Sequence, residues 1–568
     1  MSFFKGAKLN LLSIQNLSFQ QTIPYHQDYS FSYNIFINTL NFYYLRTLNL
    51  KFIFMNQLLD KTKKILSVGL KSALALPFIA SCANKEKPMN ILFIMSDDHS
   101  YQTISAYDTS FIRTPNLDRI ANEGVRFNNS FVANSISAPS RACLLTGKHS
   151  QANGFTDNSC VFDGSQQTFP KLIQDRYETA IIGKWHLNSD PTGFDHWDIL
   201  IGQGDYYNPT FIRNGEKIQR EGYATNITTD IALEWLENER DTEKPFCLLL
   251  HHKAPHRTWM PDTCDLKLFK DSNFPLPETF YDNYEGRLAA QENKMSISKD
   301  MDLVYDLKLA DKDSLIHGRP DLEGWGRWMY NNMNPEQKKA WDAHYDVVIE
   351  KFKEANPTGE DLDRWKYQQY MRDYLRVITS IDRNVGRVLD YLEEEGLLDN
   401  TLVVYTSDQG FYMGEHGWFD KRWMYEESFR TPLLVRYPGG IKGEINEMVQ
   451  NIDYAPTFLE LAGVEIPSDI HGESFLPLLK GEKHETNRDG IYYHYYEFPD
   501  EHHVKPHLGV RTETHKLIHF YKDDIWELYD LRHDQKEINN IYGQEGTEEI
   551  TSELKEKLQK LKKQYGEE

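Results

Sequence analysis

Five continuous apolar runs, with helical spacing between two of them, are the feature that most constrains the fold of this 568-residue chain. A run that is apolar at every position is typical of a strand buried on both faces of a parallel sheet. A helix is predicted between the third and fourth runs, because apolar residues recur there every three or four positions before Gly396. We therefore expect an α/β fold, a mainly parallel sheet with helices on both faces. The runs lie within MNILFIMSDD, TAIIGKWH, FCLLLHHKAPH, NTLVVYTSDQG and TPLLVRYPG, and the helical positions are Ile378, Ile381, Val385, Val388 and Leu392.

Two segments depart from this pattern. Residues 265–360 are polar and charged and contain Trp, and we expect a helical insertion over the sheet. The main domain would then span 89–484. Over 485–568, three short aromatic and apolar stretches predict antiparallel strands, and TEEITSELKEKLQKLKKQYG predicts a closing amphipathic helix. We expect a smaller C-terminal α+β subdomain there.

The N-terminal residues are expected to lie outside the fold. Residues 55–81 have a Lys-bearing start, an apolar stretch and small residues before Cys82, which resembles a bacterial lipoprotein signal. Cys82 would be the lipidated first residue of the mature chain, followed by a linker over 82–88. The polar ANKEKP after it argues against a buried helix. Residues 1–54 would be an upstream extension. We expect a membrane-anchored lipoprotein of the periplasm or cell surface.

Charge and cysteine spacing exclude two classes of site. The net charge of −22 argues against nucleic acid as a partner, so any positive charge around an anionic substrate has to be local. The five cysteines form no C-x-x-C pair and no zinc-binding spacing.

Polar side chains follow four of the predicted strands where the strands end. In open α/β sheets, ligands bind beyond the carboxyl ends of the strands. The carboxylate and amide oxygens suit a hard cation such as Ca²⁺ or Mg²⁺, the lysine and a nearby arginine suit a tetrahedral anion, and the histidines exchange protons near neutral pH. The set indicates transfer of a phosphoryl or sulfuryl group. It comprises Asp97, Asp98, Lys184, His186, His256, Asp408 and Gln409, with Arg141.

The segment NSISAPSRACLLTGKHS, residues 134–150, predicts a loop that enters a helix at Pro139 and a helix end at Gly147. Its SAPSRACLLTGK resembles the signature of the type I sulfatases, and the resemblance extends over about 89–540 through the motifs MSDDHS, TPNLDRIANEGVRFNNSF, IGKWHL, KAPH, TSDQGFYMGEHGWFDKRWMYEESFRTPLLVRYPG and ELYDL. The resemblance implies an alkaline-phosphatase-like fold and hydrolysis of sulfate esters.

The resemblance also implies site roles. Ser137 would be converted to formylglycine by an anaerobic sulfatase-maturing enzyme, and Cys143 would be a bystander. The hydrated aldehyde would attack sulfur and later expel sulfate, whereas a plain serine would be trapped as a stable ester. Asp408 would take the proton of the attacking hydroxyl, and Arg141 and Lys148 would support this nucleophile. Lys184 and Lys421 would hold sulfate oxygens. His256 would protonate the leaving sugar oxygen, and His186 would contact the formylglycine hydroxyl that does not attack. Ca²⁺ would be bound by Asp97, Asp98, Ser137, Asp408 and Gln409, where many relatives carry Asn at the last position.

The stretch FDKRWMYE, residues 419–426, looks most like the glucosamine-6-sulfatases. Asp420 and Arg422 are suited to hold one sugar hydroxyl as acceptor and donor, although a purely structural ion pair is an equal alternative. His416 and His507 are further substrate-binding candidates, for which structural roles stay open. We expect a sulfated oligosaccharide substrate, the 6-O-sulfate of N-acetyl- or N-sulfoglucosamine in heparan-type or mucin fragments.

Three alternatives remain at this point. The chain could be a sulfatase for another sugar position, a phosphatase or phosphonate monoester hydrolase with the same fold, or a non-catalytic, lipid-tethered glycan-binding protein.

Overall fold

The computed structural model describes residues 88–309 and 329–567, and residues 86–568 form one compact unit. The expectations for 1–54, 55–81 and Cys82, and all but the end of the 82–88 linker, lie outside the described residues. Among the helices of the described part, none is both long and apolar enough to cross a membrane.

The centre of the unit is a ten-stranded sheet with the order β10-β2-β9-β8-β1-β7-β3-β4-β5-β6. Strands β8, β1, β7, β3 and β4 run parallel to one another, and β9, β5 and β6 pair antiparallel with their neighbours. The expected mainly parallel sheet is confirmed. The strands are β1 (Asn90–Ser96), β2 (Val125–Phe131), β3 (Glu178–Lys184), β4 (His196–Leu200), β5 (Thr210–Arg213), β6 (Glu216–Gln219), β7 (Phe246–His251), β8 (Thr401–Ser407), β9 (Leu433–Arg436) and β10 (Gly443–Gln450).

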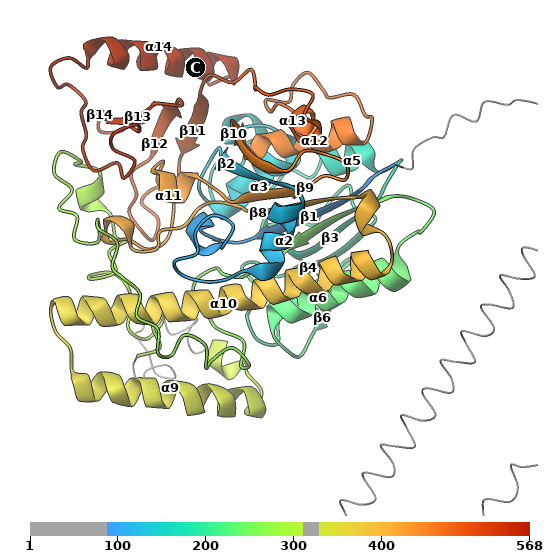
Figure 1. Ribbon diagram of the computed structural model, residues 1–568, viewed down its shortest axis with the longest axis horizontal. Coiled ribbons are helices and arrows are strands. Elements are labelled where there is room, and N and C mark those ends of the chain that lie inside the picture. The colour runs from blue at the N-terminus through green and yellow to red at the C-terminus, as the bar shows by residue number, and fades with distance from the viewer. Residues whose placement is uncertain (1–87, 310–328, 568) are drawn as a thin grey trace, which may run out of the picture. The chain divides into compact units, whose positions relative to one another are not determined.

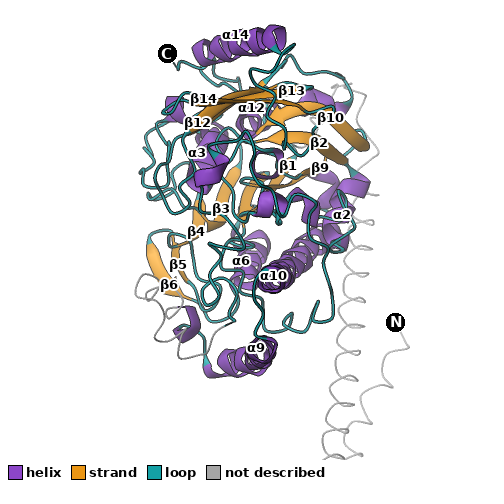
Figure 2. Cartoon of the chain, turned by 90° about the vertical axis from the view of Figure 1, so that its left-hand side faces the viewer, coloured by secondary structure: helices purple, strands orange, loops and turns teal. Residues whose placement is uncertain are grey.

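Helices cover both faces of this sheet (Figures 1 and 2). Alternate residues of β1 face opposite sides, so Leu92 and Ile94 enter a core with α2, α6 and α10, whereas Ile91 and Phe93 enter a core with α3, α5, α12 and α13. All four side chains are fully buried, which explains why the run is apolar at every position. The helices are α2 (Pro115–Glu123), α3 (Ser137–Thr146), α4 (Ser150–Asn153), α5 (Phe169–Ile173), α6 (Ala224–Glu234), α9 (Pro335–Ala355), α10 (Glu360–Glu394), α11 (Glu426–Phe429), α12 (Tyr454–Leu461) and α13 (Leu476–Lys480).

The C-terminal residues form the expected α+β subdomain. Strands β11 (Ile491–Tyr495), β12 (His507–Arg511), β13 (His515–Phe520) and β14 (Ile525–Asp530) make an antiparallel sheet in chain order, and α14 (Glu548–Gln564) covers it (Figure 1). Leu554, Leu558 and Leu561 of α14 pack on this sheet, as the amphipathic pattern predicts.

The segment 265–360 is less helical than we expect from the sequence. Residues 265–309 are mostly turns, with a single short 3₁₀ turn at Ala290–Glu292, and the long helix of this segment is α9. Pro275 and Pro277 explain part of the difference, because proline cannot continue a helix. Residues 310–328 lie outside the described residues.

Candidate active site

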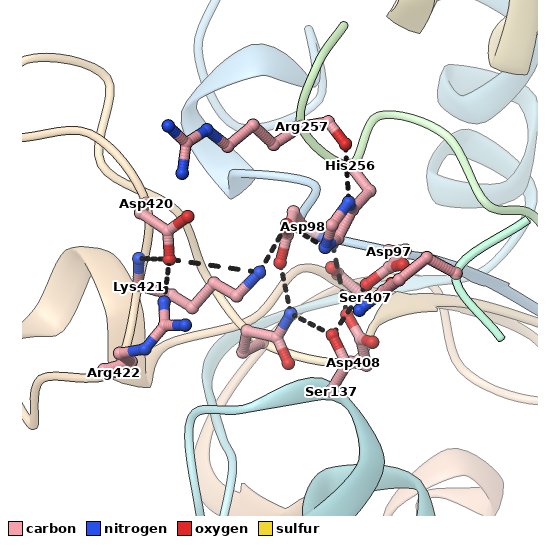
Figure 3. A network of polar contacts seen from close by, with 12 residues as sticks. Asp97, Asp98, Ser137, His256, Arg257, Ser407, Asp408, Asp420, Lys421 and Arg422 are labelled. Atoms are coloured by element: carbon pink, nitrogen blue, oxygen red, sulfur yellow. Dashed lines mark hydrogen bonds and ion pairs between the residues drawn. The ribbon is translucent and has the colours of Figure 1, made fainter. Parts of the chain in front are cut away.

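The polar residues predicted at the strand ends do meet at one edge of the sheet. Strands β8, β1, β7 and β3 are consecutive neighbours, so the residues that follow them emerge side by side. The backbone N–H of Asp408 donates to Ser96 O at 3.2 Å, and that of Asp97 donates to Ala254 O at 3.1 Å, which ties the three loops together. Figure 3 shows the resulting network of charged side chains.

Ser137 is the first residue of α3 and is almost fully buried. Its Oγ donates to Asp97 Oδ1 at 2.8 Å and accepts from Gln409 Nε2 at 3.3 Å. The helix ends as the sequence predicts, at Gly147, whose φ of 67° is readily adopted by glycine and whose N–H bonds to Cys143 O. The free N–H groups of a helix N-terminus favour negative charge there, so α3 aims its positive end at this serine.

Three positive side chains hold the carboxylates in place. Arg141 donates from Nε and Nη2 to Asp408 Oδ2 at 3.1 and 2.9 Å. Lys421 Nζ lies 2.6 Å from Asp98 Oδ2, and Lys184 contacts Asp97 directly. Each of these cations is buried, so each ion pair acts in a weakly screened environment.

The three carboxyls differ in their readiness to ionise. Burial raises the pKa of Asp98 to about 6, and burial together with the charge of Asp97 raises the pKa of Asp408 to about 7. Burial acts on Asp97 in the same direction, but the lysines, His256 and Arg141 hold its pKa well below the usual range. Of the three carboxyls, Asp97 therefore stays ionised to the lowest pH.

The same groups could hold a metal ion. Asp97, Asp98 and His256 offer ligand atoms within 4.8 Å of one another. Asp408 lies next to them, because its Oδ1 accepts the backbone N–H of Asp98 at 3.1 Å. The buried Oε1 of Gln409 has no hydrogen-bond partner among the described residues. Three carboxylates and an amide oxygen fit a hard divalent cation.

Two histidines border this cluster. His256 lies after β7, and its Nε2 is 3.8 Å from Asp98 Oδ2. His186 follows β3 with a left-handed φ of 59°, and its buried Nδ1 has no hydrogen-bond partner among the described residues. Burial and the charge of Lys184 lower the pKa of both imidazoles, which favours the neutral rings in the free protein.

Asp420 and Arg422 form a buried pair next to Lys421 (Figure 3). Both have left-handed backbone conformations, with φ of 78° and 97°, which cost free energy in residues other than glycine. Residues that adopt such conformations cluster at functional sites. The pair is thus held in an unfavourable geometry beside the group that binds Asp98.

A segment of the C-terminal subdomain holds this pair, and the sequence gives no local signal for it. Asp500 Oδ2 accepts from Arg422 Nε at 2.6 Å, and His502 Nε2 lies 3.3 Å from Asp420 Oδ2. Glu501 Oε1 accepts from Arg257 at 2.5 Å. These residues belong to DEHH in the 485–568 subdomain, an acidic and histidine-rich run whose contacts with Asp420, Arg422 and Arg257 join residues far apart in sequence.

The structure corrects the placement of Lys148. It lies after the C-terminal end of α3, and a ten-residue helix separates it from Ser137 by about 15 Å. Its Nζ pairs with Asp469 at 2.5 Å, on a partly exposed surface. Lys148 is therefore not among the groups that contact the nucleophile position.

The two further candidate histidines, His416 and His507, have structural partners, in line with the alternative left open from the sequence. His416 is fully buried and bonds through Nδ1 to Asp282 Oδ2 at 2.7 Å. His507 is also fully buried, and its Nε2 accepts the backbone N–H of Met424 at 3.1 Å. Both rings pack against aromatic side chains such as Trp418 and Trp423, so both serve the interior.

Known protein families and proteins resemble this chain over most of its length. The family model described as sulfatase matches residues 89–464, and the model for the C-terminal part of N-sulphoglucosamine sulphohydrolase matches 414–564. An N-acetylglucosamine-6-O-sulfatase of Bacteroides thetaiotaomicron is 51% identical over 512 residues, covering 87% of this chain and 91% of the relative. The human N-acetylglucosamine-6-sulfatase is 26% identical over 436 residues, covering 72% of this chain and 67% of its own length.

Solved structures agree with the sequence matches. The structure of BT4656 in complex with its substrate D-glucosamine-2-N,6-O-disulfate has a TM-score of 0.81 and 51% identity, and the match covers 85% of this chain and 98% of that one. A phosphonate monoester hydrolase of Agrobacterium radiobacter, 20% identical with a TM-score of 0.60 over 84% of this chain and 96% of that one, shares the fold. With the charged edge of the sheet and a family match over more than half of its length, this chain belongs to the sulfatase family, as the motif at Ser137 predicts.

Proposed function

We propose that this sulfuric ester hydrolase removes the 6-O-sulfate of a glucosamine residue, N-acetylated or N-sulfated, at the non-reducing end of a heparan-type or mucin oligosaccharide. The observation that carries the proposal is the buried Asp420–Arg422 pair beside Lys421. Support comes from the 51% identical relative, which is named N-acetylglucosamine-6-O-sulfatase, and from the substrate bound to BT4656.

Ser137 is the proposed nucleophile position. Family membership implies that this residue becomes formylglycine through a separate maturing enzyme, and its hydrated form supplies a hydroxyl that attacks sulfur and a second one whose proton loss releases sulfate. The residues around Ser137 fit such a group, because its Oγ already lies between Asp97 and Gln409. His186 is proposed to contact the second hydroxyl.

The remaining charged residues divide the work of hydrolysis. Asp408 is the proposed acceptor of the nucleophile's proton, because its carboxylate lies beside Asp98 in the cluster around Ser137. Lys184 and Lys421 are proposed to bind sulfate oxygens, and Arg141 keeps Asp408 oriented. His256 is proposed to protonate the leaving sugar oxygen, and an anionic ester bound beside it favours the imidazolium form.

Calcium is the proposed metal. The family implies a metal ion, and Asp97, Asp98, Asp408 and Gln409 provide the oxygen ligands that Ca²⁺ prefers, with Ser137 beside them. The ion would supply positive charge next to the sulfate. The Oε1 of Gln409, buried and without a hydrogen-bond partner in the described part of the chain, supports the assignment.

Recognition of the sugar is assigned to hydroxyl O4. A 6-O-sulfate is carried on the exocyclic carbon next to the ring carbon that bears O4, so a site that grips this sulfate through Lys421 has O4 within reach. Asp420 accepts and Arg422 donates, which together satisfy one hydroxyl. A site built for a hydroxyl discriminates strongly against sugars that present it elsewhere.

The testing experiment is a panel of sulfated monosaccharides and disaccharides given to matured protein. We expect hydrolysis of glucosamine-6-sulfate at a non-reducing end and very slow hydrolysis of galactose-6-sulfate, in which O4 is inverted. Comparable kcat/KM on both sugars would contradict the O4 assignment. Faster hydrolysis of phosphate esters than of sulfate esters would contradict the proposed reaction.

The mature protein is proposed to begin at lipidated Cys82 and to face the periplasm or the cell surface. The sequence pattern before Cys82 supports this. A version that begins at Lys85 should be soluble and fully active, and N-terminal mass analysis of the native protein should find a diacylated or triacylated cysteine. Loss of folding on removal of residues 1–54 would contradict the proposal.

A further inference from the structure

The loop that carries His256 has no regular secondary structure between β7 and residue 261. Backbone hydrogen bonds such as Asp97 N–H to Ala254 O hold its start, and side chains from elsewhere hold the rest. Tyr206 donates to His256 O at 2.6 Å, and Asp306 and Lys308, in the segment that precedes α9 in the chain, hold the residues that follow.

The ring of His256 is oriented by its neighbour's peptide. Nδ1 lies 2.7 Å from the carbonyl oxygen of Arg257, and Figure 3 shows this contact above Asp98. A carbonyl only accepts, so Nδ1 carries the hydrogen in both protonation states of the ring. Nε2 is left facing Asp98 and the charged cluster. Whatever fixes the backbone of Arg257 thus fixes the direction of Nε2.

Asp306 fixes Arg257. Its two oxygens accept from Arg257 Nε at 2.6 Å and Nη2 at 3.0 Å, a bidentate pair with fixed relative orientation. Asp306 is fully buried, and the third guanidinium nitrogen donates to Glu501 at 2.5 Å. The guanidinium also lies over the rings of Tyr305 and Phe419. The arginine therefore has little freedom to move.

Lys308 holds the next residues of the loop. Its buried Nζ donates to Thr258 O at 2.5 Å and to Trp259 O at 3.1 Å, and it lies 3.2 Å from Asp373 of α10. The segment 306–308 thus holds the loop at Arg257, through Asp306, and at Thr258 and Trp259, through Lys308. Through Asp373, Lys308 also connects this loop to α10.

We propose that Asp306 is a positioning residue for catalysis: by holding Arg257, it keeps the Arg257 carbonyl where it aims His256 Nε2 at the leaving oxygen of the substrate. The inference rests on the proposed role of His256 as the acid. An alternative is that the Asp306–Arg257 pair only ties two loops together, with no effect that passes through His256.

A double-mutant cycle separates these readings, because residues that act as one unit have non-additive effects. Asp306→Asn, His256→Ala and the double variant are assayed as matured protein on glucosamine-6-sulfate. We expect Asp306→Asn to lower kcat by about tenfold or more with KM within about threefold, since misdirecting a general acid costs part of its contribution. In the His256→Ala background, the same change should lower kcat by less than about twofold.

The matched control is Asp453→Asn. Asp453 forms a comparably buried, bidentate pair with Arg488, at 2.5 and 2.7 Å, that has no contact with His256. It should lower the melting temperature as Asp306→Asn does, while kcat of the folded fraction stays unchanged. If Asp306→Asn unfolds below the assay temperature, Arg257→Met runs the same cycle, because its apolar stem keeps the packing on Tyr305 and Phe419.

Two outcomes count against different statements. An equal loss of kcat from Asp306→Asn in both backgrounds would overturn the positioning role and leave the role of His256 intact. An unchanged kcat in His256→Ala alone would show instead that the proposed acid is wrong, whatever Asp306 does.

Discussion

The cluster at the strand ends and the Asp420–Arg422 pair are neighbours through Lys421, but different parts of the chain build them. Asp97, Asp408 and Lys184 are fixed by the order of neighbouring parallel strands. The pair is held by residues from another subdomain, Asp500 and His502. If the proposed roles hold, the first arrangement serves any sulfate ester, whereas the second can change without disturbing the sheet. The proposal therefore places the chemistry at the sheet edge and the choice of sugar in the contacts between subdomains.

The largest effect is expected at Ser137. Ser137→Ala should lower kcat by roughly 10⁴-fold or more, because it removes the group that forms the bond to sulfur. In protein made together with an anaerobic maturing enzyme, mass spectrometry of the peptide with Ser137 should show the loss of two hydrogens. Full activity of a protein whose Ser137 is unmodified would contradict the proposed mechanism, in which the strand-end cluster acts on formylglycine.

Removal of the metal should abolish activity on every sulfate ester alike. A chelator leaves Asp97, Asp98 and Asp408 as neighbouring buried carboxyls without their cation, so sulfate binding and nucleophile alignment should both suffer. Activity is to be followed after chelation and after addition of Ca²⁺, Mg²⁺ or Zn²⁺ in turn. We expect Ca²⁺ to restore it. Restoration by Zn²⁺ alone would contradict an oxygen-ligand site.

A smaller and more selective effect is expected at the pair. Asp420→Ala and Arg422→Ala should each lower kcat/KM on glucosamine-6-sulfate by more than about tenfold, or roughly 1.4 kcal/mol. The ratio of kcat/KM for glucosamine-6-sulfate over galactose-6-sulfate should fall in both. Asp500→Asn, which loosens Arg422 from outside the pocket, should move the ratio in the same direction. Equal losses of kcat/KM on the two sugars would show that the pair is only a structural ion pair.

The smallest effect is expected at Lys148. Its ion pair with Asp469 is partly exposed, and such pairs contribute about 0–1 kcal/mol. Lys148→Ala should therefore leave kcat/KM within about twofold and stability within about 1 kcal/mol. A large loss of kcat with normal stability would show that Lys148 acts in catalysis, and that its distance from Ser137 along α3 does not exclude it.

Much of the fold and of the catalytic edge follows from the sequence. The apolar runs identify β1, β3, β7 and β8, and a parallel sheet brings the residues after its strands to one edge, so Asp97 and Asp408 could be paired without a structure. The resemblance implies a role for Lys148 beside Ser137, but α3 carries Lys148 to the other end of the helix. The roles of Asp306 and Asp500 could not be predicted, because their partners lie 49 and 78 residues away in sequence.

Two of the histidines also show what a sequence motif cannot predict. His416 and His507 occur in motifs that look functional, yet both are fully buried among aromatic rings. Sequence shows that a histidine follows a conspicuous pattern, but only the structure shows the partners of the ring, Asp282 for His416 and Met424 for His507. Of the strand-end histidines, His186 follows β3 closely, whereas His256 is also held through Arg257 and Asp306.

The burial of Ser137 also sets an order of events in the life of the protein. In the folded chain this side chain is only 1% exposed and lies within the first turn of α3. A maturing enzyme has to take this residue into its own active site, which the folded first turn of α3 hinders, so we expect the proposed conversion to happen on a nascent or unfolded chain. Each molecule that folds before it is modified then keeps a serine. The yield of active protein therefore depends on the rate of modification relative to the rate of folding.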